Sequence, residues 1–193
     1  MTKARLEAFT DGVIAIIITI MVLELKVPHG ADFTALQSSL PVFLAYVLSY
    51  VNVGIFWNNH HHMLHAAARI DGKVLWANLF LLFWMSLIPF VIRCMDEAGL
   101  TALPTAAYGV VLAMAAISYH LLQWAIVARD GRSSTLAVAL GSDLKGKLSI
   151  AGYVVAIPLA FVSPWIAVVL YVAIALMWFV PDRRIESVVN RPE

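Results

Sequence analysis

The feature that most constrains the fold is a series of long apolar segments that carry almost no charge. Of the 193 residues, 62% are hydrophobic and 13% are charged, whereas about a quarter of a soluble domain is charged. A helix needs about 20 mostly apolar residues to cross the hydrocarbon core of a bilayer. The sequence therefore predicts an all-α membrane protein, a single domain over residues 1–193 with six transmembrane helices at about 6–25, 39–65, 74–92, 102–128, 148–161 and 165–180.

The basic residues indicate how these helices are oriented. With six crossings, both termini lie on one side of the membrane, and eleven of the thirteen lysines and arginines then fall on that side. Because loops rich in lysine and arginine stay in the cytoplasm, we expect a multi-pass protein with both termini cytoplasmic. The eleven are Lys3, Arg5, Arg69, Lys73, Arg129, Arg132, Lys145, Lys147, Arg183, Arg184 and Arg191, and the other side receives Lys26 and Arg93.

The first apolar segment differs from the others because carboxylates bound it closely. Only twelve uncharged residues separate Asp11 from Glu24. At 1.5 Å per residue they span about 18 Å, well short of a hydrocarbon core of about 30 Å. A helix of this kind is poorly suited to lipid, so we expect it in the interior of a helix bundle.

A helical projection divides this first segment into two faces. At 100° per residue, Ile16, Thr19, Ile20 and Leu23 form one stripe. Asp11 lies about 140° from Ile16 on the same projection. If the stripe faces an axis, Asp11 therefore points into the surrounding helices, where we expect it to fasten the helix, with Arg5 as its partner.

Several polar residues of other segments lie at the depth of Asp11. They are His60 near the end of the second segment, Asn78 about one turn into the third, and His120 and Gln123 in the fourth. An unsatisfied polar group in hydrocarbon costs several kcal/mol. We therefore expect these side chains to hydrogen-bond to one another in one layer.

The first segment starts with Arg5-Leu6-Glu7-Ala8-Phe9-Thr10-Asp11. This stretch resembles the signature of the transmembrane protein 175 family of potassium channels. The family signature is Arg-x-x-x-Phe-Ser-Asp, and threonine takes the place of serine here. Further similarity lies in Trp57-Asn58-Asn59-His60 and in Leu75-Trp76-Ala77-Asn78-Leu79, while the last three segments match only in type.

The resemblance implies a homotetramer of six-helix subunits in the plasma (inner) membrane of a prokaryote. Its function would be that of a potassium-permeable cation channel, with potassium ions as the permeant species and no cofactor. The first helix of each subunit would line the pore, with apolar constrictions at Ile16, Thr19, Ile20 and Leu23 in place of a carbonyl selectivity filter. A hydrogen-bonded network would hold that helix, made of Arg5, Phe9, Thr10, Asp11, His60 and Asn78.

Two other function classes stay open on the residues alone. A proton-coupled transporter could use Asp11 and a histidine of the second helix as its relay, because intramembrane carboxylates often carry protons. A metal-binding membrane protein could use His61 and His65, which share a helical face, but further ligands are not visible, and we expect no metal.

Enzymes and nucleic-acid partners are not indicated. The sequence holds no phosphate loop, metalloprotease motif or nucleophile with a matching base. A formal net charge of +1 gives no sign of a nucleic-acid partner. The expected partners are the lipid bilayer, monovalent cations and further copies of the chain.

Overall fold

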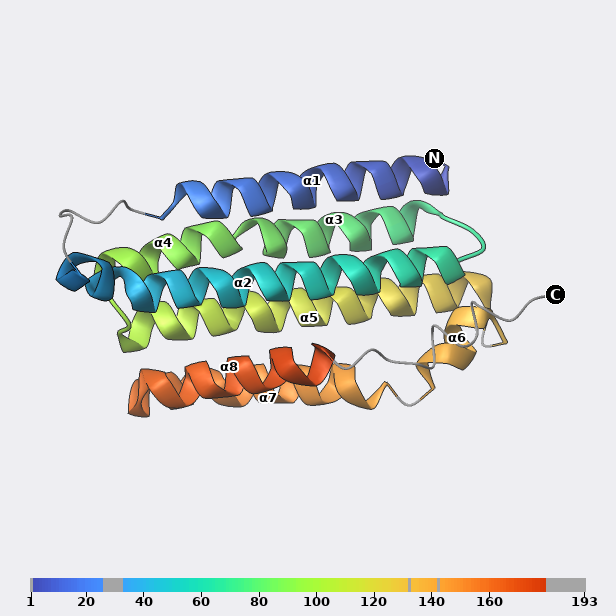
Figure 1. Cartoon of the computed structure of the whole chain (residues 1–193). Helices are drawn as coiled ribbons and strands as arrows, with labels where there is room; N and C mark the ends of the chain where they lie inside the picture. Colours follow the sequence, from blue (N-terminus) through green and yellow to red (C-terminus); the bar gives the residue numbers. More distant parts are fainter. Residues whose placement is uncertain (1, 26–32, 132, 142, 180–193) are drawn as a thin grey trace.

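The chain folds into an elongated bundle of helices that run alongside one another (Figure 1). The structure is a computed structural model and describes residues 2–25, 33–131, 133–141 and 143–179. The described residues form eight α-helices: α1 (Lys3–Leu23), α2 (Phe33–Ala66), α3 (Gly72–Ser86), α4 (Ile88–Ala98), α5 (Ala102–Asp130), α6 (Thr135–Leu140), α7 (Leu144–Val162) and α8 (Pro164–Phe179).

Five parts of the described chain are long and apolar enough to cross a membrane. They are α1, residues Ser39–Ala66 of α2, the stretch Gly72–Ala98 that contains α3 and α4, α5, and α7. The apolar helix α8 has 16 residues, fewer than the roughly 20 that a crossing needs. The all-α membrane architecture is therefore confirmed, while the sixth crossing stays a prediction.

The third apolar segment is two helices where the sequence predicted one. Its chain turns at Leu87, whose N–H donates to the Trp84 carbonyl at 3.2 Å. Pro89 lies in the first turn of α4 and has no N–H to continue the hydrogen-bond ladder of α3. The proline therefore accounts for the interruption between Ser86 and Ile88.

Two further differences from the predicted helices lie between α5 and the first turn of α7. The sequence placed the beginning at about residue 148, but α7 begins at Leu144, because Asp143 accepts a hydrogen bond from the Gly146 N–H and caps the helix. The short helix α6 was not predicted. It begins after Ser134, whose hydroxyl accepts a bond from the Ala137 N–H.

The core of the bundle is organised around α5, which contacts α3, α4, α7 and α8. The hydrophobic core extends along most of its length, from Ala106 to Ile126. The helix α1 lies at the edge of the bundle and contacts α2, α3 and α4 (Figure 1). One side of α1 is thus left without a covering helix from the described chain.

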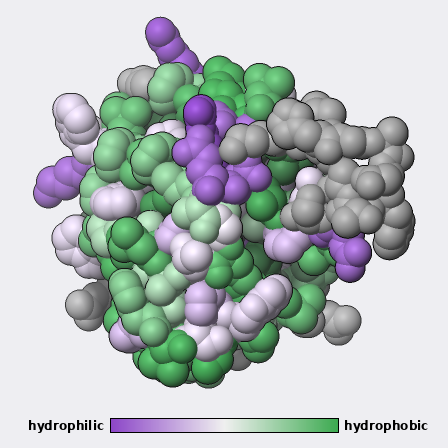
Figure 2. All heavy atoms as spheres, turned by 90° about the vertical axis from the view of Figure 1, so that its left-hand side faces the viewer, coloured by the Kyte–Doolittle hydropathy of each residue, from purple (hydrophilic) through white to green (hydrophobic). Residues whose placement is uncertain are grey.

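Many large hydrophobic side chains lie exposed on the outside of the bundle, among them Trp76, Phe90 and Val169. Figure 2 shows the end of the bundle at which α4 lies, with hydrophobic atoms over much of the face and its lower edge, a hydrophilic patch in its upper middle, and further hydrophilic groups projecting at the top and left. An apolar outer surface is expected where lipid tails replace water as the solvent. The surface therefore agrees with helices that cross a bilayer.

Candidate functional site

The first helix has one buried and one exposed face. The buried residues recur every three or four positions and are Leu6, Thr10, Ile14, Ile17 and Met21. On the opposite face, 58% of Ile16, 40% of Ile20 and 80% of Leu23 are exposed, and Thr19 is exposed too. The stripe that the sequence singled out is therefore an apolar surface that the described part of the chain leaves open.

The Thr19 hydroxyl is oriented by its own helix. Its Oγ1 atom donates to the carbonyls of Ala15 at 3.1 Å and Ile16 at 2.9 Å. A hydroxyl has one proton and two acceptor lone pairs. With the proton turned toward the backbone, Thr19 offers an oxygen acceptor to whatever faces the exposed side of α1.

A buried chain of hydrogen bonds attaches α1 to two other helices. Asn78 Nδ2 on α3 donates to Thr10 Oγ1 at 2.9 Å, and Asn78 Oδ1 lies 2.7 Å from His60 Nε2 on α2. Since the amide oxygen can only accept, His60 carries its proton on Nε2. All three side chains are buried, and the structure brings these three predicted residues together.

The partner of Asp11 is Trp57 of α2, whose Nε1 atom donates to Asp11 Oδ1 at 2.8 Å. The structure does not bring Arg5 to Asp11: within the described residues no hydrogen bond or ion pair joins them. Residues six apart on an α-helix point about 120° away from each other, which explains the separation. Arg5 and Phe9 are both exposed.

Both ends of α1 also contact other helices. Lys3 Nζ donates to the carbonyls of His65 at 2.8 Å and Ala67 at 3.3 Å, at the C-terminal end of α2. A cation there satisfies free carbonyls and complements the helix dipole. At the other end, Arg93 of α4 lies 3.5 Å from Glu24. This role of Lys3 was not predicted from the sequence, because a lysine near the N-terminus indicates only which side of the membrane that terminus occupies.

The remaining polar residues do not join this layer. The rings of His61, His62 and His65 pack on one another, and the described residues contain no group of three or more histidine, cysteine, aspartate or glutamate side chains that could hold a metal ion. His120 bonds to Asp143, which precedes α7. The expected single layer is therefore two separate clusters, one on α1 and one beside α7.

The sequence of this chain is similar to a family model and to several known proteins. The family model described as endosomal/lysosomal potassium channel TMEM175 matches residues 5–89. A potassium channel of Chryseobacterium sp. (strain P1-3) is 50% identical over 187 residues, which cover 97% of each chain. A potassium channel of Streptomyces collinus (strain DSM 40733 / Tue 365) is 31% identical over 180 residues, 83% of this chain and 84% of that one.

A solved structure has the same fold. The crystal structure of a lysosomal potassium-selective channel TMEM175 homolog from Chamaesiphon minutus superposes with a TM-score of 0.78 at 28% identity, over 93% of this chain and 97% of that one. The match extends well beyond the first three helices, where the sequence motifs lie. The chain therefore belongs to the TMEM175 family.

Proposed function

We propose that this protein is a potassium channel in which four copies of the chain surround a pore lined by α1. The observation that carries the proposal is the exposed stripe of Ile16, Thr19, Ile20 and Leu23 on a helix whose opposite face is anchored to α2 and α3. The relatives named as potassium channels support the choice of ion.

The length of the apolar part of α1 favours a pore over a lipid-facing surface. About 18 Å separate Asp11 and Glu24 along the helix axis, and a lipid-facing helix needs an apolar length of about 30 Å. Around a central axis, these carboxylates would lie toward the two mouths of the pore. Water there would hydrate them at no cost to the bilayer.

Ion selection would depend on dehydration at the apolar rings. Four copies each of Ile16, Ile20 and Leu23 would form constrictions about 6 Å and 4.5 Å apart along the axis. Apolar constrictions can also close a pore by excluding water. Potassium sheds its water at a lower cost than sodium, so narrow apolar rings favour potassium, and the acceptor of Thr19 would partly replace the lost water.

Arg5 and Phe9 make no hydrogen bond or ion pair of their side chains within the described part of the chain, and both fit this assembly. Arg5 lies 18 residues before Leu23, which is five full helical turns, so both point in the same direction as the stripe. Phe9 is exposed on a neighbouring part of that face. We propose that Arg5 and Phe9 contact an adjacent subunit from the exposed face of α1, while Thr10, Asn78 and His60 hold the opposite face within the same chain.

The membrane setting follows from the charge distribution. We propose that the protein lies in the plasma (inner) membrane of a prokaryote with both termini in the cytoplasm, because eleven of its thirteen basic residues then lie on the cytoplasmic side. The bacterial relatives agree with this assignment.

Flux and mass measurements test the proposal together. Purified protein in potassium-loaded liposomes should release potassium faster than sodium, and its mass in mild detergent should be that of four chains. Ile16→Asn should raise sodium flux relative to potassium, because a polar ring lowers the dehydration cost. A monomeric mass, or an ion preference that Ile16→Asn leaves unchanged, would contradict the pore assignment.

A further inference from the structure

An apolar groove of about 370 Å³ runs between α2 and α8. It extends from Pro41 to Val51 along α2 and from Trp165 to Phe179 along α8, and all of its lining side chains are apolar or aromatic. Protein interiors contain few voids larger than a water molecule. A groove of this size is therefore open to an occupant from the surroundings of the protein.

Two buried tyrosines, Tyr108 of α5 and Tyr171 of α8, form the floor of the groove. The Tyr108 hydroxyl lies 2.9 Å from Ser49 Oγ, and the Tyr171 hydroxyl donates to the Thr105 carbonyl at 3.0 Å. Both hydroxyls are thus engaged by protein atoms, and the two rings pack edge to face. Because an apolar cavity stays dry and binds apolar ligands, neither water nor an ion is the expected occupant.

Small side chains leave the space between the two helices unfilled. Ala45 of α2 and Ala175 of α8 both line the groove, and an alanine side chain ends at its Cβ atom. The two helices contact each other, but atoms that border an unfilled space lose dispersion contacts on that side. An apolar ligand beside these alanines therefore stabilises the packing of α8 on α2.

The groove is about as long as one leaflet of the bilayer is deep. Its α2 wall belongs to the candidate membrane crossing Ser39–Ala66, and the chain advances about 15 Å between Pro41 and Val51. A hydrocarbon core of about 30 Å gives about 15 Å for each leaflet. Because α2 and α8 both start at the same end of the bundle (Figure 1), the groove lies in the leaflet at that end, which is the extracellular leaflet in the topology that we propose.

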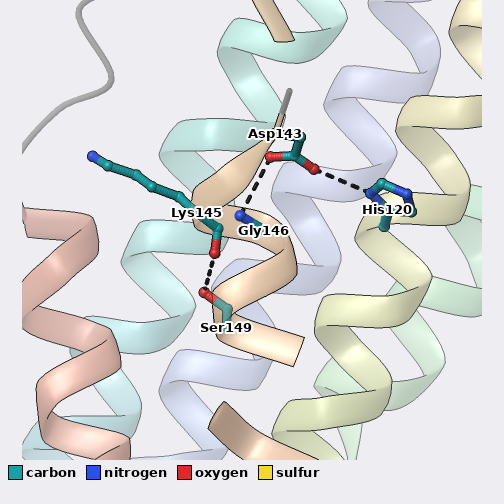
Figure 3. A network of polar contacts seen from close by, with 5 residues as sticks. All are labelled: His120, Asp143, Lys145, Gly146 and Ser149. Carbon is teal, nitrogen blue, oxygen red and sulfur yellow. Dashed lines mark hydrogen bonds and ion pairs between the residues drawn. The ribbon is translucent and has the colours of Figure 1, made fainter. Parts of the chain in front are cut away.

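Polar contacts hold α8 at its C-terminal end, next to the start of α7. Trp178 Nε1 donates to Ser149 Oγ at 2.7 Å, and Ser149 Oγ donates to the Lys145 carbonyl at 2.8 Å. In the same cluster Asp143 Oδ2 lies 3.1 Å from His120 Nδ1 (Figure 3). Among the described residues no hydrogen bond or ion pair joins α8 to α2. The α2 side of α8 is therefore held by apolar contacts, which an occupant of the groove extends.

The groove opens onto the surface that faces lipid. Its rims include the exposed side chains of Leu44 and Val47 on α2 and of Trp165 and Leu176 on α8. The helix α1 contacts α2, α3 and α4, whereas α8 contacts α2, α5 and α7, and α1 and α8 lie on opposite sides of the bundle (Figure 1). Four copies around α1 therefore place α8 at the periphery, where lipid tails are the apolar material that surrounds the protein.

The charge at the groove favours a phospholipid over a free fatty acid. No lysine or arginine lines the groove in the part of the chain that the structure describes, so a carboxylate inside it would have no cation as a partner. Trp165 is exposed at the outer end, and tryptophan favours the headgroup level, where its N–H reaches polar groups. A ligand whose charged end stays in water fits these residues.

We propose that the groove binds one acyl chain of a phospholipid from the extracellular leaflet, with the headgroup beside Trp165. The chain lies beside Ala45 and Ala175, over the rings of Tyr108 and Tyr171, and joins α8 to α2. The proposal depends on the membrane location of these helices and not on the pore. A conducting channel without this lipid, or a bound lipid without conduction, therefore separates the two proposals.

The first test identifies the bound molecule on the full-length protein. After purification from membranes in mild detergent, native mass spectrometry should show one phospholipid retained by each chain. Delipidated protein should unfold at a lower temperature, and added dioleoyl phosphatidylglycerol should restore the thermal midpoint, because a ligand that binds the folded state stabilises it. A free fatty acid in place of the phospholipid, or a midpoint that lipid does not change, overturns the proposal.

Two variants that fill the groove make the result specific. Ala45→Phe places a ring between α2 and α8, and Val172→Phe places one at an exposed position of the lining, where the fold accommodates it more easily. Both should lose the retained phospholipid and the rise in midpoint on adding lipid. Ala173→Phe is the matched control, because Ala173 is exposed on α8 and does not line the groove, and it should keep both. Retention of the phospholipid by both filled variants overturns the proposal.

The second test locates the acyl chain. In nanodiscs of a phosphatidylglycerol brominated midway along its chains, electron cryo-microscopy should show bromine between α2 and α8 in the unmodified protein and in Ala173→Phe, and not in Val172→Phe. Side chains of a second copy in the groove, or bromine spread evenly over the outer surface, overturn the proposal. Potassium flux measured on the same samples reports on the pore separately.

Discussion

Asn78 Nδ2 lies 2.9 Å from Thr10 Oγ1, and this bond joins α3 to the helix that we propose as the pore lining. Both side chains are fully buried. Removing one member of a buried pair leaves the other unsatisfied, at a cost of about 1–3 kcal/mol. The bond is therefore a sensitive point for testing how α1 is held.

Thr10→Val removes the hydroxyl at nearly constant volume and should lower the free energy of unfolding by about 1–3 kcal/mol. Asn78→Leu should cost more, because it also leaves His60 without its acceptor. The double variant should cost less than the sum of the two single variants, since both break the same contact. Thermal unfolding in detergent measures all three, and Asn58→Leu, at an exposed site of α2, is the control.

The hydrogen bond between Asp11 and Trp57 separates the channel from the proton-coupled transporter. Asp11→Asn keeps an oxygen that can accept the Trp57 N–H, so a channel should retain most of its potassium flux. A transporter that relays protons through Asp11 should lose transport completely. Potassium flux and internal pH, followed together in liposomes, distinguish the two, and a loss of coupled proton movement with the fold intact would favour the transporter.

Cysteine substitution tests which face of α1 meets water. In a Cys94→Ser background, Ile16→Cys and Leu23→Cys should react with a water-soluble thiol reagent, and the modification should block most of the flux. Val154→Cys is the matched control, because Val154 is 51% exposed on α7 and should face lipid. Equal reactivity at Val154 and Ile16, or modification without block, would contradict the pore lining.

The contact of Lys3 with the C-terminal end of α2 should add a small amount to the free energy of unfolding and should stabilise the first turn of α1 in particular. Lys3→Met removes the donor to the His65 carbonyl and should cost about 0.3–1 kcal/mol, as for other cations at helix C-termini. Lys3→Arg keeps the charge and the donors and should restore stability. Hydrogen exchange should show faster opening of the first turn of α1 in Lys3→Met alone, whereas faster exchange throughout the bundle would point to a global effect.

The helical period explains why the exposed stripe of α1 could be predicted. Ile16 and Leu23 share a direction for purely geometric reasons, and burial of Ile14 and Ile17 on the other side follows from the same period. Polarity explains the bond between Thr10 and Asn78, since buried polar groups at one depth must find partners. Neither argument requires knowledge of how the helices pack against one another.

Partner choice between helices could not be predicted in the same way. Tryptophan is common at membrane interfaces for general reasons, and no feature of the sequence near Trp57 indicates that its N–H donates to Asp11. Asp143 and His120 are 23 residues apart, and their contact depends on the angle at which α7 packs on α5. The division of the third apolar segment into α3 and α4 was also not predicted, because hydropathy alone does not show that Pro89 interrupts the helix, and the stretch Gly72–Ala98 remains one candidate crossing.

The contacts of α1 are unequal along its length, and this has a mechanical consequence. Its N-terminal half is held by the buried bonds of Thr10, whereas near its other end the ion pair of Glu24 involves an Arg93 side chain that is 57% exposed, and an exposed pair of this kind contributes little. Polar contacts therefore hold α1 more firmly near Thr10 than near Glu24, where the buried Met21 packs in the core. In the tetramer that we propose, we expect α1 to move most at Leu23 and least at Thr10 when the pore opens.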